Sequence, residues 1–335
     1  MADLLVRADG TCVACARQCD LRSGVGQCGV RRLDDGQLIV DDAVTHIAVQ
    51  PVERKPFYHY RPGVQLLTLG SWGCGTRCGY CRNAEAALAR RWPRARSVAL
   101  SDPVGLAIER GAAGIAFSYN EPLIRAEQVA ETCSAAVKQD LEAVIVTSGW
   151  ATPEALALLA PVTTAWRVDI KAASEQSALR IFGEAGLPWA SAFEALRRLA
   201  RTDRHLEVSV TYSPSIHDHN ELALIGERVC AAAGHDTAVH LQPLLPAHRL
   251  RAIETPTLTD LLTARHLLRA AGLRHVYVHF LGPAALRATW CECGACLVER
   301  SVVKVRVNIE PDGRCGSCGA PTPVKVSRQM QEAAA

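Results

Sequence analysis

The sequence predicts an α/β protein built on a parallel sheet, and two observations favour this class. Short β-branched or apolar runs alternate with longer Ala/Leu-rich stretches between residues 64 and 283. In the longer stretches, apolar residues recur at intervals of three and four, which is the spacing of amphipathic helices. Alternating strands and crossover helices form consecutive βα units. The pattern leaves open a doubly wound sheet or an open, partial barrel, and both carry their chemistry at the carboxyl ends of the strands.

The expected elements follow in chain order. The predicted strands, of which the first six are expected to form the parallel sheet, are Val64–Leu69, Gly114–Phe117, Ala143–Val146, Trp166–Ile170, Leu206–Thr211, Ala238–Leu241 and His275–Phe280. The predicted crossover helices are Glu127–Lys138, Pro153–Leu159, Ala192–Ala200, Leu222–Ala232 and Leu258–Ala271.

Composition excludes several classes of protein. The chain has 335 residues, of which 49% are hydrophobic and 21% charged, so it is expected to be globular rather than disordered or fibrous. A net charge of +3 gives no reason to expect binding to nucleic acid or to a membrane. No apolar run reaches the roughly 18 residues needed to span a bilayer. The first residues lack the apolar stretch of a signal peptide, so the expected location is cytoplasmic.

Cysteine is unusually frequent, with 14 residues. In a reducing compartment they are more suited to metal binding than to disulfides. Their grouping divides the chain into a Cys-rich metal-binding segment over residues 1–60, a catalytic barrel over 61–284, a zinc-ribbon-like domain over 285–325 and a tail over 326–335.

Three cysteines follow the first predicted strand, in the run Cys74-Gly-Thr-Arg-Cys78-Gly-Tyr80-Cys81. Three thiolates at this spacing can hold three irons of a [4Fe–4S] cluster and leave the fourth iron without a protein ligand. An open coordination position predicts chemistry at this site. The spacing C-x3-C-x2-C with an aromatic residue before the last cysteine resembles the signature of the radical S-adenosylmethionine (SAM) enzymes.

The resemblance continues at other strand ends. Tyr119-Asn120-Glu121-Pro122 is similar to the family's Gly-Gly-Glu-Pro motif, which holds the SAM amino group. Asp169-Ile-Lys171 is similar to the Asp-x-Lys segment of the pyruvate formate-lyase activating enzymes, in which the lysine meets the SAM carboxylate. The resemblance implies that Tyr80 faces the adenine, while Asn120 and Ser148 are polar residues that could reach the ribose or the methionine part.

A narrower resemblance covers nearly the whole chain. Four segments are similar to the radical SAM proteins of the AmmeMemoRadiSam system. They are Gly-Gln-Cys-Gly-Val-Arg in the N-terminal segment, residues 51–59, residues 147–154 and the C-terminal cysteine knuckles. This implies a partial (β/α)6 TIM-like barrel, a site-differentiated [4Fe–4S] cluster and reductive cleavage of SAM. It also implies possible Memo-type and AMMECR-type partners.

The residues that act on the substrate are less well defined. His240, at a strand end where the family also has a histidine, and His279 are the catalytic candidates. The family often has Gly-Asn after its last barrel strand, where this chain has His279-Phe280, and an Arg-Phe-x-Pro segment where this chain has residues 240–246. Substrate specificity cannot be transferred across these differences.

The terminal cysteines form two further candidate metal sites. Cys315-Gly-Ser-Cys318 has the form of a zinc knuckle, and Cys293 is its surest partner. The glycine after Cys293 favours Cys291 as the fourth ligand, whereas the spacing favours Cys296. The N-terminal set could bind zinc, which we favour, or an auxiliary iron–sulfur cluster, and consists of Cys12, Cys15, Cys19 and Cys28.

Weaker signals concern loops. His217 lies in a loop and could bind a metal or transfer protons, although a loop histidine is usually solvated. Tyr58 and His59 lie just before the barrel and either close one end of it or simply pack there. A short basic run after the cysteine trio could recognise an acidic partner, although a solvated loop is the simpler interpretation, and it contains Arg90, Arg91, Arg94 and Arg96 around Trp92.

The predicted function is a radical SAM enzyme acting on an unidentified small molecule or peptide, with a flavodoxin- or ferredoxin-like electron donor. The alternatives are transfer of a SAM-derived alkyl group and activation of a glycyl-radical enzyme. A zinc-ribbon scaffold without activity would leave the trio, Glu121 and Lys171 unexplained and lacks the expected basic stripe.

Overall fold

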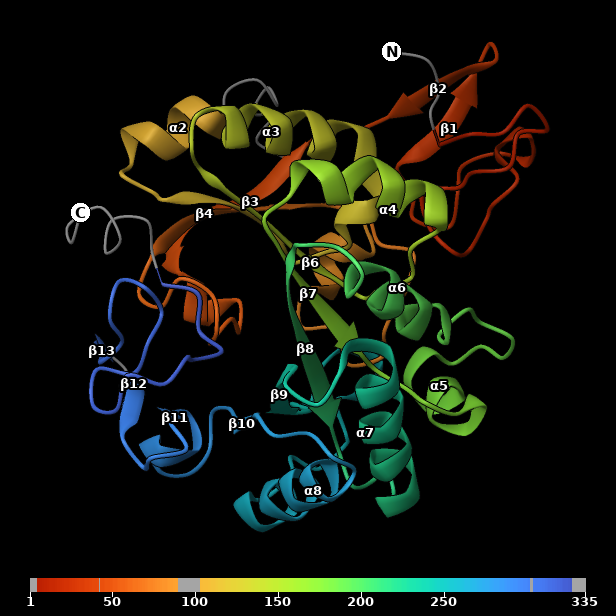
Figure 1. Ribbon diagram of the computed structural model, residues 1–335. Coiled ribbons are helices and arrows are strands. Elements are labelled where there is room, and N and C mark those ends of the chain that lie inside the picture. The colour runs from red at the N-terminus through yellow and green to blue at the C-terminus, as the bar shows by residue number, and fades with distance from the viewer. Residues whose placement is uncertain (1–4, 42, 90–102, 302–303, 327–335) are drawn as a thin grey trace.

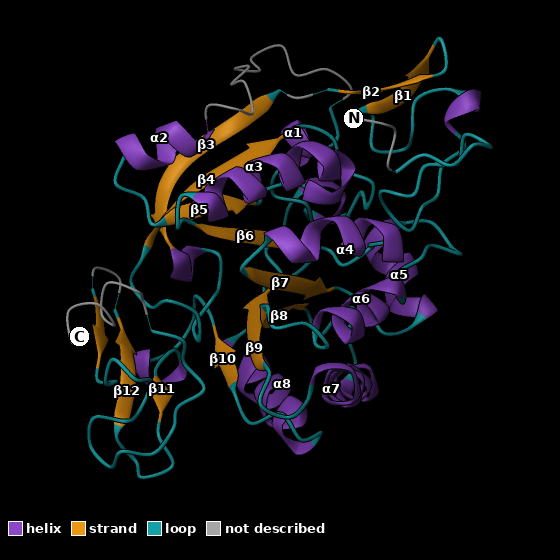
Figure 2. Ribbon diagram, turned by 45° about the horizontal axis from the view of Figure 1, so that its top comes forward, coloured by secondary structure: helices purple, strands orange, loops and turns teal. Residues whose placement is uncertain are grey.

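The structure is a computed structural model that describes residues 5–41, 43–89, 103–301 and 304–326. Its main sheet has eight strands in the order β10-β9-β8-β7-β6-β5-β4-β3. The seven strands from β4 to β10 are parallel, and β3 pairs antiparallel with β4 at one edge. Helices cover the outer face of this curved sheet (Figure 1, Figure 2). The expected α/β class and partial barrel are confirmed.

The parallel strands lie where the apolar runs predicted them. They are β4 (Gln65–Ser71), β5 (Gly114–Phe117), β6 (Glu142–Thr147), β7 (Ala165–Ile170), β8 (His205–Tyr212), β9 (Ala238–Pro243) and β10 (Val276–Val278). The last run also joins the parallel sheet, beside β9, so the sheet has one parallel strand more than the six expected.

The helices confirm the five predicted crossovers and add others. They are α1 (Ala84–Ala87), α2 (Pro103–Glu109), α3 (Ala126–Lys138), α4 (Pro153–Leu159), α5 (Glu175–Phe182), α6 (Ser191–Leu199), α7 (His219–Ala233) and α8 (Leu258–Ala270). Helix α5 was not predicted, although it has clear end signals. Ser174 caps its first turn and Gly183 ends it in the left-handed conformation, with φ of 76°.

Strand β3 (Val44–Pro51) is the main unpredicted part of the sheet. It lies inside the segment assigned to metal binding, and it is preceded by a hairpin of β1 (Arg31–Asp34) and β2 (Gln37–Val40). The last third of the predicted segment 1–60 is therefore built into the barrel wall. Within β3 only Val44 is buried and Val49 is exposed, which suits a strand at the edge of a sheet.

The barrel core has two layers because alternate residues of each strand point to opposite faces. One face packs under the helices. The other face points into the barrel, where Leu66, Ala116 and Val144 pack against Phe57 and Tyr60. Residues 52–60 thus close the amino end of the strands, and we call this segment the floor. This is one of the two roles expected for Tyr58 and His59.

The C-terminal residues form a small sheet of β11 (Thr289–Trp290), β12 (Cys296–Arg300) and β13 (Val305–Val307), which we call the ribbon. The ribbon has its own apolar cluster. It docks at the floor, where Arg300 donates a hydrogen bond to the carbonyl of Tyr58 and Lys325 exchanges backbone hydrogen bonds with His59 and Arg61. The N-terminal hairpin lies at the other end of the molecule (Figure 1, Figure 2).

None of the described helices is long and apolar enough to cross a bilayer. The basic run at residues 90–96 and most of the predicted tail lie outside the described residues.

Candidate functional site

The cysteine trio occupies a tight loop at the carboxyl end of β4. Gly73 has φ of 83°, and a side chain there would place its Cβ 2.6 Å from the carbonyl oxygen of Cys28. This position therefore requires glycine. Within the loop, the hydroxyl of Thr76 lies 3.1 Å from the sulfur of Cys74 and 3.5 Å from that of Cys78. The loop holds three thiols beside one another at the mouth of the barrel.

The thiols of the trio are held largely away from water. Burial raises the pKa of Cys74 to about 11, and burial also raises the pKa of Cys78 and Cys81. A buried thiol without a metal stays protonated, whereas metal binding releases the proton. The loop therefore suits thiolates that are neutralised by a bound cationic centre.

Glu121 lies beside the trio and joins two strand ends. Its carboxylate accepts hydrogen bonds from the Thr147 hydroxyl at 2.7 Å and from the Ser148 hydroxyl and amide at 2.6 and 2.8 Å. It is 3% exposed, and burial raises its pKa although these bonds oppose the shift. The structure thus brings two predicted site residues, Glu121 and Ser148, into direct contact.

The side chain of Asn120 is hydrogen-bonded to the cysteine loop, and its contact with SAM stays a prediction. Its side-chain amide donates to the carbonyl of Gly73 at 2.9 Å and to the hydroxyl of Ser71, and its oxygen accepts from the Ser71 amide at 3.0 Å. Both ends of the side chain hold the start of the cysteine loop. In this structure, Asn120 positions the loop.

Lys171 follows the end of β7 and lies near Cys78 and Cys81 of the trio. Its ammonium group is 3.4 Å from the Asp169 carboxylate and 5.8 Å from the centre of the Tyr80 ring. Burial disfavours the charged lysine, but Tyr80, Asp169 and Cys78 more than offset this and hold its pKa well above the usual range. Lys171, Asp169 and Tyr80 therefore lie together, and their contact with SAM stays a prediction.

His217 is buried rather than solvated. It is 1% exposed, and its Nε2 lies 2.9 Å from the carbonyl oxygen of Lys171. The interpretation as a solvated loop histidine was wrong, because the chain after β8 folds back over the end of β7. His217 fixes the backbone that carries Lys171.

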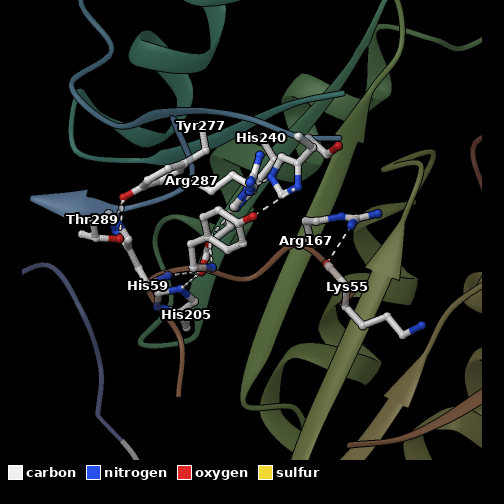
Figure 3. A network of polar contacts seen from close by, with 12 residues as sticks. Lys55, His59, Arg167, His205, His240, Tyr277, Arg287 and Thr289 are labelled. Atoms are coloured by element: carbon white, nitrogen blue, oxygen red, sulfur yellow. Dashed lines mark hydrogen bonds and ion pairs between the residues drawn. The ribbon is translucent and has the colours of Figure 1, made fainter. Parts of the chain in front are cut away.

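His240 belongs to a buried polar network that contacts the floor (Figure 3), and His279 is part of the same network. His240 lies 2.9 Å from His279 through Nδ1 and 2.6 Å from Glu207 through Nε2. His279 continues the chain to the Tyr58 hydroxyl at 3.3 Å. Because the carboxylate only accepts, His240 donates from Nε2 and accepts from His279, which in turn accepts from Tyr58. Both imidazoles are neutral, since burial lowers the pKa of His240 and of His279.

Glu207 is the centre of this network and was missed by sequence reasoning. It is fully buried and also accepts the backbone amides of Tyr58 and His59 at 2.9 and 3.0 Å and the His205 ring at 2.8 Å. Burial would raise its pKa, but the hydrogen bonds from His205 and His240 hold it well below the usual range. A glutamate within an apolar strand was the available signal.

The ribbon brings four thiols together. All of their sulfur atoms lie within 4.8 Å of one another, and the cysteines are Cys291, Cys293, Cys315 and Cys318. The sulfurs of Cys291 and Cys318 are 3.7 Å apart, and those of Cys293 and Cys315 are 3.9 Å apart. Zinc–sulfur bonds of about 2.3 Å in a tetrahedron require about 3.8 Å between sulfurs. The structure therefore favours Cys291 over Cys296 as the fourth ligand.

The N-terminal cysteines gather at the mouth of the barrel. Cys12 and Cys19 are joined by a backbone hydrogen bond of 2.8 Å, and the sulfur of Cys15 is 3.7 Å from where a Cβ on Gly75 would lie. Arg17 donates to the carbonyl of Gly75 at 2.5 Å. Within the described residues, neither this set nor the trio brings three thiols within the 4.8 Å that the ribbon set achieves.

Comparison with known proteins identifies one domain of the chain. The sequence description of the radical SAM superfamily matches residues 71–221, which run from the end of β4 to the start of α7 and contain the trio, Glu121 and Lys171. These residues form a radical SAM domain. The matched domain is that of the radical SAM superfamily, whose members are enzymes, and the AmmeMemoRadiSam subtype stays a prediction.

One relative is similar over almost its full length. It is the Uncharacterized protein MJ0808 of Methanocaldococcus jannaschii, which is 27% identical over 321 residues, 92% of this chain and 93% of the relative.

Solved structures resemble the barrel at low identity. A domain of a pyruvate-formate lyase-activating enzyme from Bacteroides vulgatus covers 50% of this chain and all of its own length, with 18% identity and a TM-score of 0.43. A radical SAM methyltransferase from Sphaerobacter thermophilus covers 65% of this chain and 71% of its own, with 17% identity and a TM-score of 0.49. At these identities the likeness concerns the fold alone.

Proposed function

We propose that this enzyme reductively cleaves SAM at a [4Fe–4S] cluster held by Cys74, Cys78 and Cys81, and so starts radical chemistry on its substrate. The observation that carries the proposal is that three groups meet at the carboxyl ends of the barrel strands. The trio, the Glu121 carboxylate and the Lys171 ammonium come from three different strand ends and meet around the same loop.

The residues present fit an iron–sulfur cluster better than a single ion. The trio supplies only thiols, which are the usual ligands of such clusters. Its sulfurs are less tightly grouped than those of the ribbon set within the described chain. A cluster of several irons spreads its thiolates farther apart than one ion does, so the wider grouping supports this assignment.

When bound, the cluster supplies an electron to the carbon–sulfur bond of SAM, and the protein contributes placement and exclusion of water. Glu121, fixed by Thr147 and Ser148, offers negative charge to the SAM amino group. Lys171, held near Cys78 and Tyr80, offers a cation to the carboxylate. Asn120 keeps the cysteine loop in register with both.

Further parts of the proposal concern the other cysteines and the partners. We assign zinc to the ribbon set, because the spacing of its sulfurs matches a zinc tetrahedron. The N-terminal set is assigned to zinc or an auxiliary cluster. All 14 cysteines are free of disulfides, which suits a reducing cytoplasm with a flavodoxin- or ferredoxin-like donor. Memo-type and AMMECR-type partners belong to the proposed subtype.

The test is to titrate the reduced cluster with SAM and to record its electron paramagnetic resonance spectrum. SAM that binds an open iron changes the cluster signal, and we expect this in the wild type. Lys171→Met should need about tenfold more SAM, since it loses one charge-assisted contact. The matched control is Lys138→Met, at the exposed end of α3, which should titrate like the wild type. A signal that SAM leaves unchanged would contradict the proposal.

A further inference from the structure

Lys55 is a buried lysine inside the barrel that the proposed function leaves unused. It is 4% exposed, and its ammonium donates to the Gln50 side-chain oxygen at 2.8 Å. It also lies 4.3 Å from the centre of the Tyr119 ring. Within the described residues, Lys55 forms no ion pair with a carboxylate. An ammonium group removed from water without a counter-charge is costly, so such a residue needs a reason.

The neighbours of Lys55 increase this cost. The charged groups that act on it are Arg167 on β7 and Arg54 in the floor, and both are cations. Burial, together with Arg167 and Arg54, lowers the pKa of Lys55 to about 7. Arg167 is 8% exposed and donates to the Lys55 carbonyl at 2.6 Å (Figure 3). This bond holds Arg167 against the backbone of Lys55, and the Arg167 guanidinium is paired with Asp169 at 2.9 Å.

The backbone of Tyr119 is strained, and this strain sets the surroundings of Lys55. It has φ of 71°, which is unfavourable for a residue with a side chain, and it stands where the family motif has glycine. Its ring covers Gly70, where a Cβ would come within 2.7 Å of it, and its hydroxyl bonds Gln50 at 3.2 Å. The strain therefore places an aromatic face and a fixed amide oxygen against the Lys55 ammonium.

A buried hydroxyl nearby also lacks a partner. Thr68 is fully buried, and its oxygen finds no hydrogen bond among the described residues. It is two residues from Leu66, which pairs with Gln50 across the strands, so Thr68 and Gln50 are diagonal neighbours on the inner face. An unused donor thus lies on the same wall as the unpaired ammonium.

The depth of these groups suits a substrate rather than SAM. Arg167, Asp169 and Lys171 share one face of β7, and four residues of a strand span about 13 Å. Lys171 lies at the mouth beside the trio, so Arg167 and Lys55 lie deeper. Tyr119 connects the two levels, because its carbonyl accepts from Asn83, two residues after Cys81.

We propose that Lys55 and Arg167 form a binding site for an anionic oxygen group of the substrate, a carboxylate or a phosphate, below the SAM site. The inference rests on the proposed function for its place in catalysis. The incoming anion would supply the counter-charge that Lys55 lacks, and Arg167, which is already paired with Asp169, would add positive charge nearby. The substrate class is therefore an anionic molecule, whose charged end points towards the floor.

The test is the thermal stability of the full chain with its reconstituted cluster, titrated with inorganic phosphate or with acetate. Sodium chloride at equal ionic strength controls for general salt effects. A ligand that binds only the folded state raises the melting temperature with concentration. We expect one of the two anions to do so beyond sodium chloride, and the one that acts identifies the phosphate or the carboxylate source. Binding should weaken as the pH rises through about 7, since Lys55 then loses its proton.

Two variants should remove this response. Lys55→Met deletes the ammonium, and Gln50→Glu places a carboxylate 2.8 Å from it with almost no change in shape. Each is expected to weaken anion binding about tenfold or more, since one charge-assisted contact is lost. The control Lys138→Met should respond like the wild type. If Lys55→Met fails to fold, Gln50→Glu still decides the outcome.

The site is overturned if neither anion stabilises the wild type beyond sodium chloride, or if Gln50→Glu responds fully. The proposed function is scored separately in the same preparation, from SAM cleavage products after reduction. Anion binding without SAM cleavage would refute the function and keep the site, and the reverse result would refute the site alone.

Discussion

The two terminal sets of cysteines lie at opposite ends of the barrel and contact different parts of it. The N-terminal set lies beside the loop of the cysteine trio at the carboxyl ends of the strands, where Arg17 of the same segment donates a hydrogen bond to the carbonyl of Gly75. The ribbon set is attached to the floor, where Arg300 bonds Tyr58 at the amino ends. Only the ribbon set, of the described thiols, has the close spacing of a single-ion site. The place of a cysteine set in the barrel, rather than its number of thiols, indicates whether it touches the chemistry.

The largest expected effect is on the ribbon, whose metal should be removable without affecting the other end of the barrel. Replacing Cys315 and Cys318 by serine should remove the ribbon metal, because a structural zinc site contributes about 10 kcal/mol of binding free energy or more. The ribbon should then become sensitive to proteases, while the iron content of the barrel stays at the wild-type value. Metal analysis and limited proteolysis measure both. A parallel loss of barrel iron would show that the two ends are not independent.

The next effect concerns the floor. Glu207→Gln should destabilise the protein by about 3 kcal/mol in urea unfolding. Each carboxylate oxygen accepts one backbone amide, from Tyr58 or His59, and an amide side chain turns its own donor towards one of them. A histidine can change tautomer, but a backbone amide cannot.

The pH dependence of the same variant gives a second readout. The pKa of Glu207 is lowered in the folded state, so its contribution is present above the unfolded pKa of about 4.5 and is lost as the pH falls below that. The stability difference between wild type and Glu207→Gln should therefore shrink under acid. The exposed Glu194→Gln is the control and should stay within about 0.5 kcal/mol of wild type at every pH. A constant difference for Glu207→Gln would contradict the assignment of an ionised carboxylate.

The smallest effect concerns Lys55, which lies between the two ends of the barrel. Its replacement should increase the stability of the protein rather than decrease it. Lys55→Met should stabilise the protein by about 1 to 2 kcal/mol at pH 6, because it removes a buried ammonium that has no counter-charge. The pKa of Lys55 is lowered from about 10.5 in the unfolded chain to about 7 in the folded protein, so its destabilising effect grows as the pH falls through this range. The stability gained by Lys55→Met should therefore be smaller at pH 9 than at pH 6. Destabilisation at pH 6 would show that the chain itself supplies the missing charge.

Local signals were sufficient for much of the mouth. The trio, Glu121 and Lys171 follow predicted strands directly, and parallel strands bring their carboxyl ends together. The fourth ribbon ligand could not be decided from spacing. Cys296 begins a strand, β12, whereas Cys291 lies on the turn that faces the knuckle.

The long-range partners of the floor and of the anion site were beyond sequence reasoning. Glu207 meets Tyr58 from 149 residues away, and Arg167 meets Lys55 from 112 residues away. No local pattern encodes contacts of such long range. Strand β3 was missed because it lies in a segment whose cysteines and polar residues indicated a separate metal-binding unit.

The central claim is that the trio holds the cluster that cleaves SAM. The most direct measurement compares the anaerobically reconstituted wild type with the Cys74/Cys78/Cys81→Ala triple variant, for iron and for nucleoside products after reduction with dithionite. We expect the wild type to release 5′-deoxyadenosine or methylthioadenosine, which also tells which carbon–sulfur bond breaks, and the variant to release neither. Intact SAM with the wild type, or equal product from both proteins, would contradict the account.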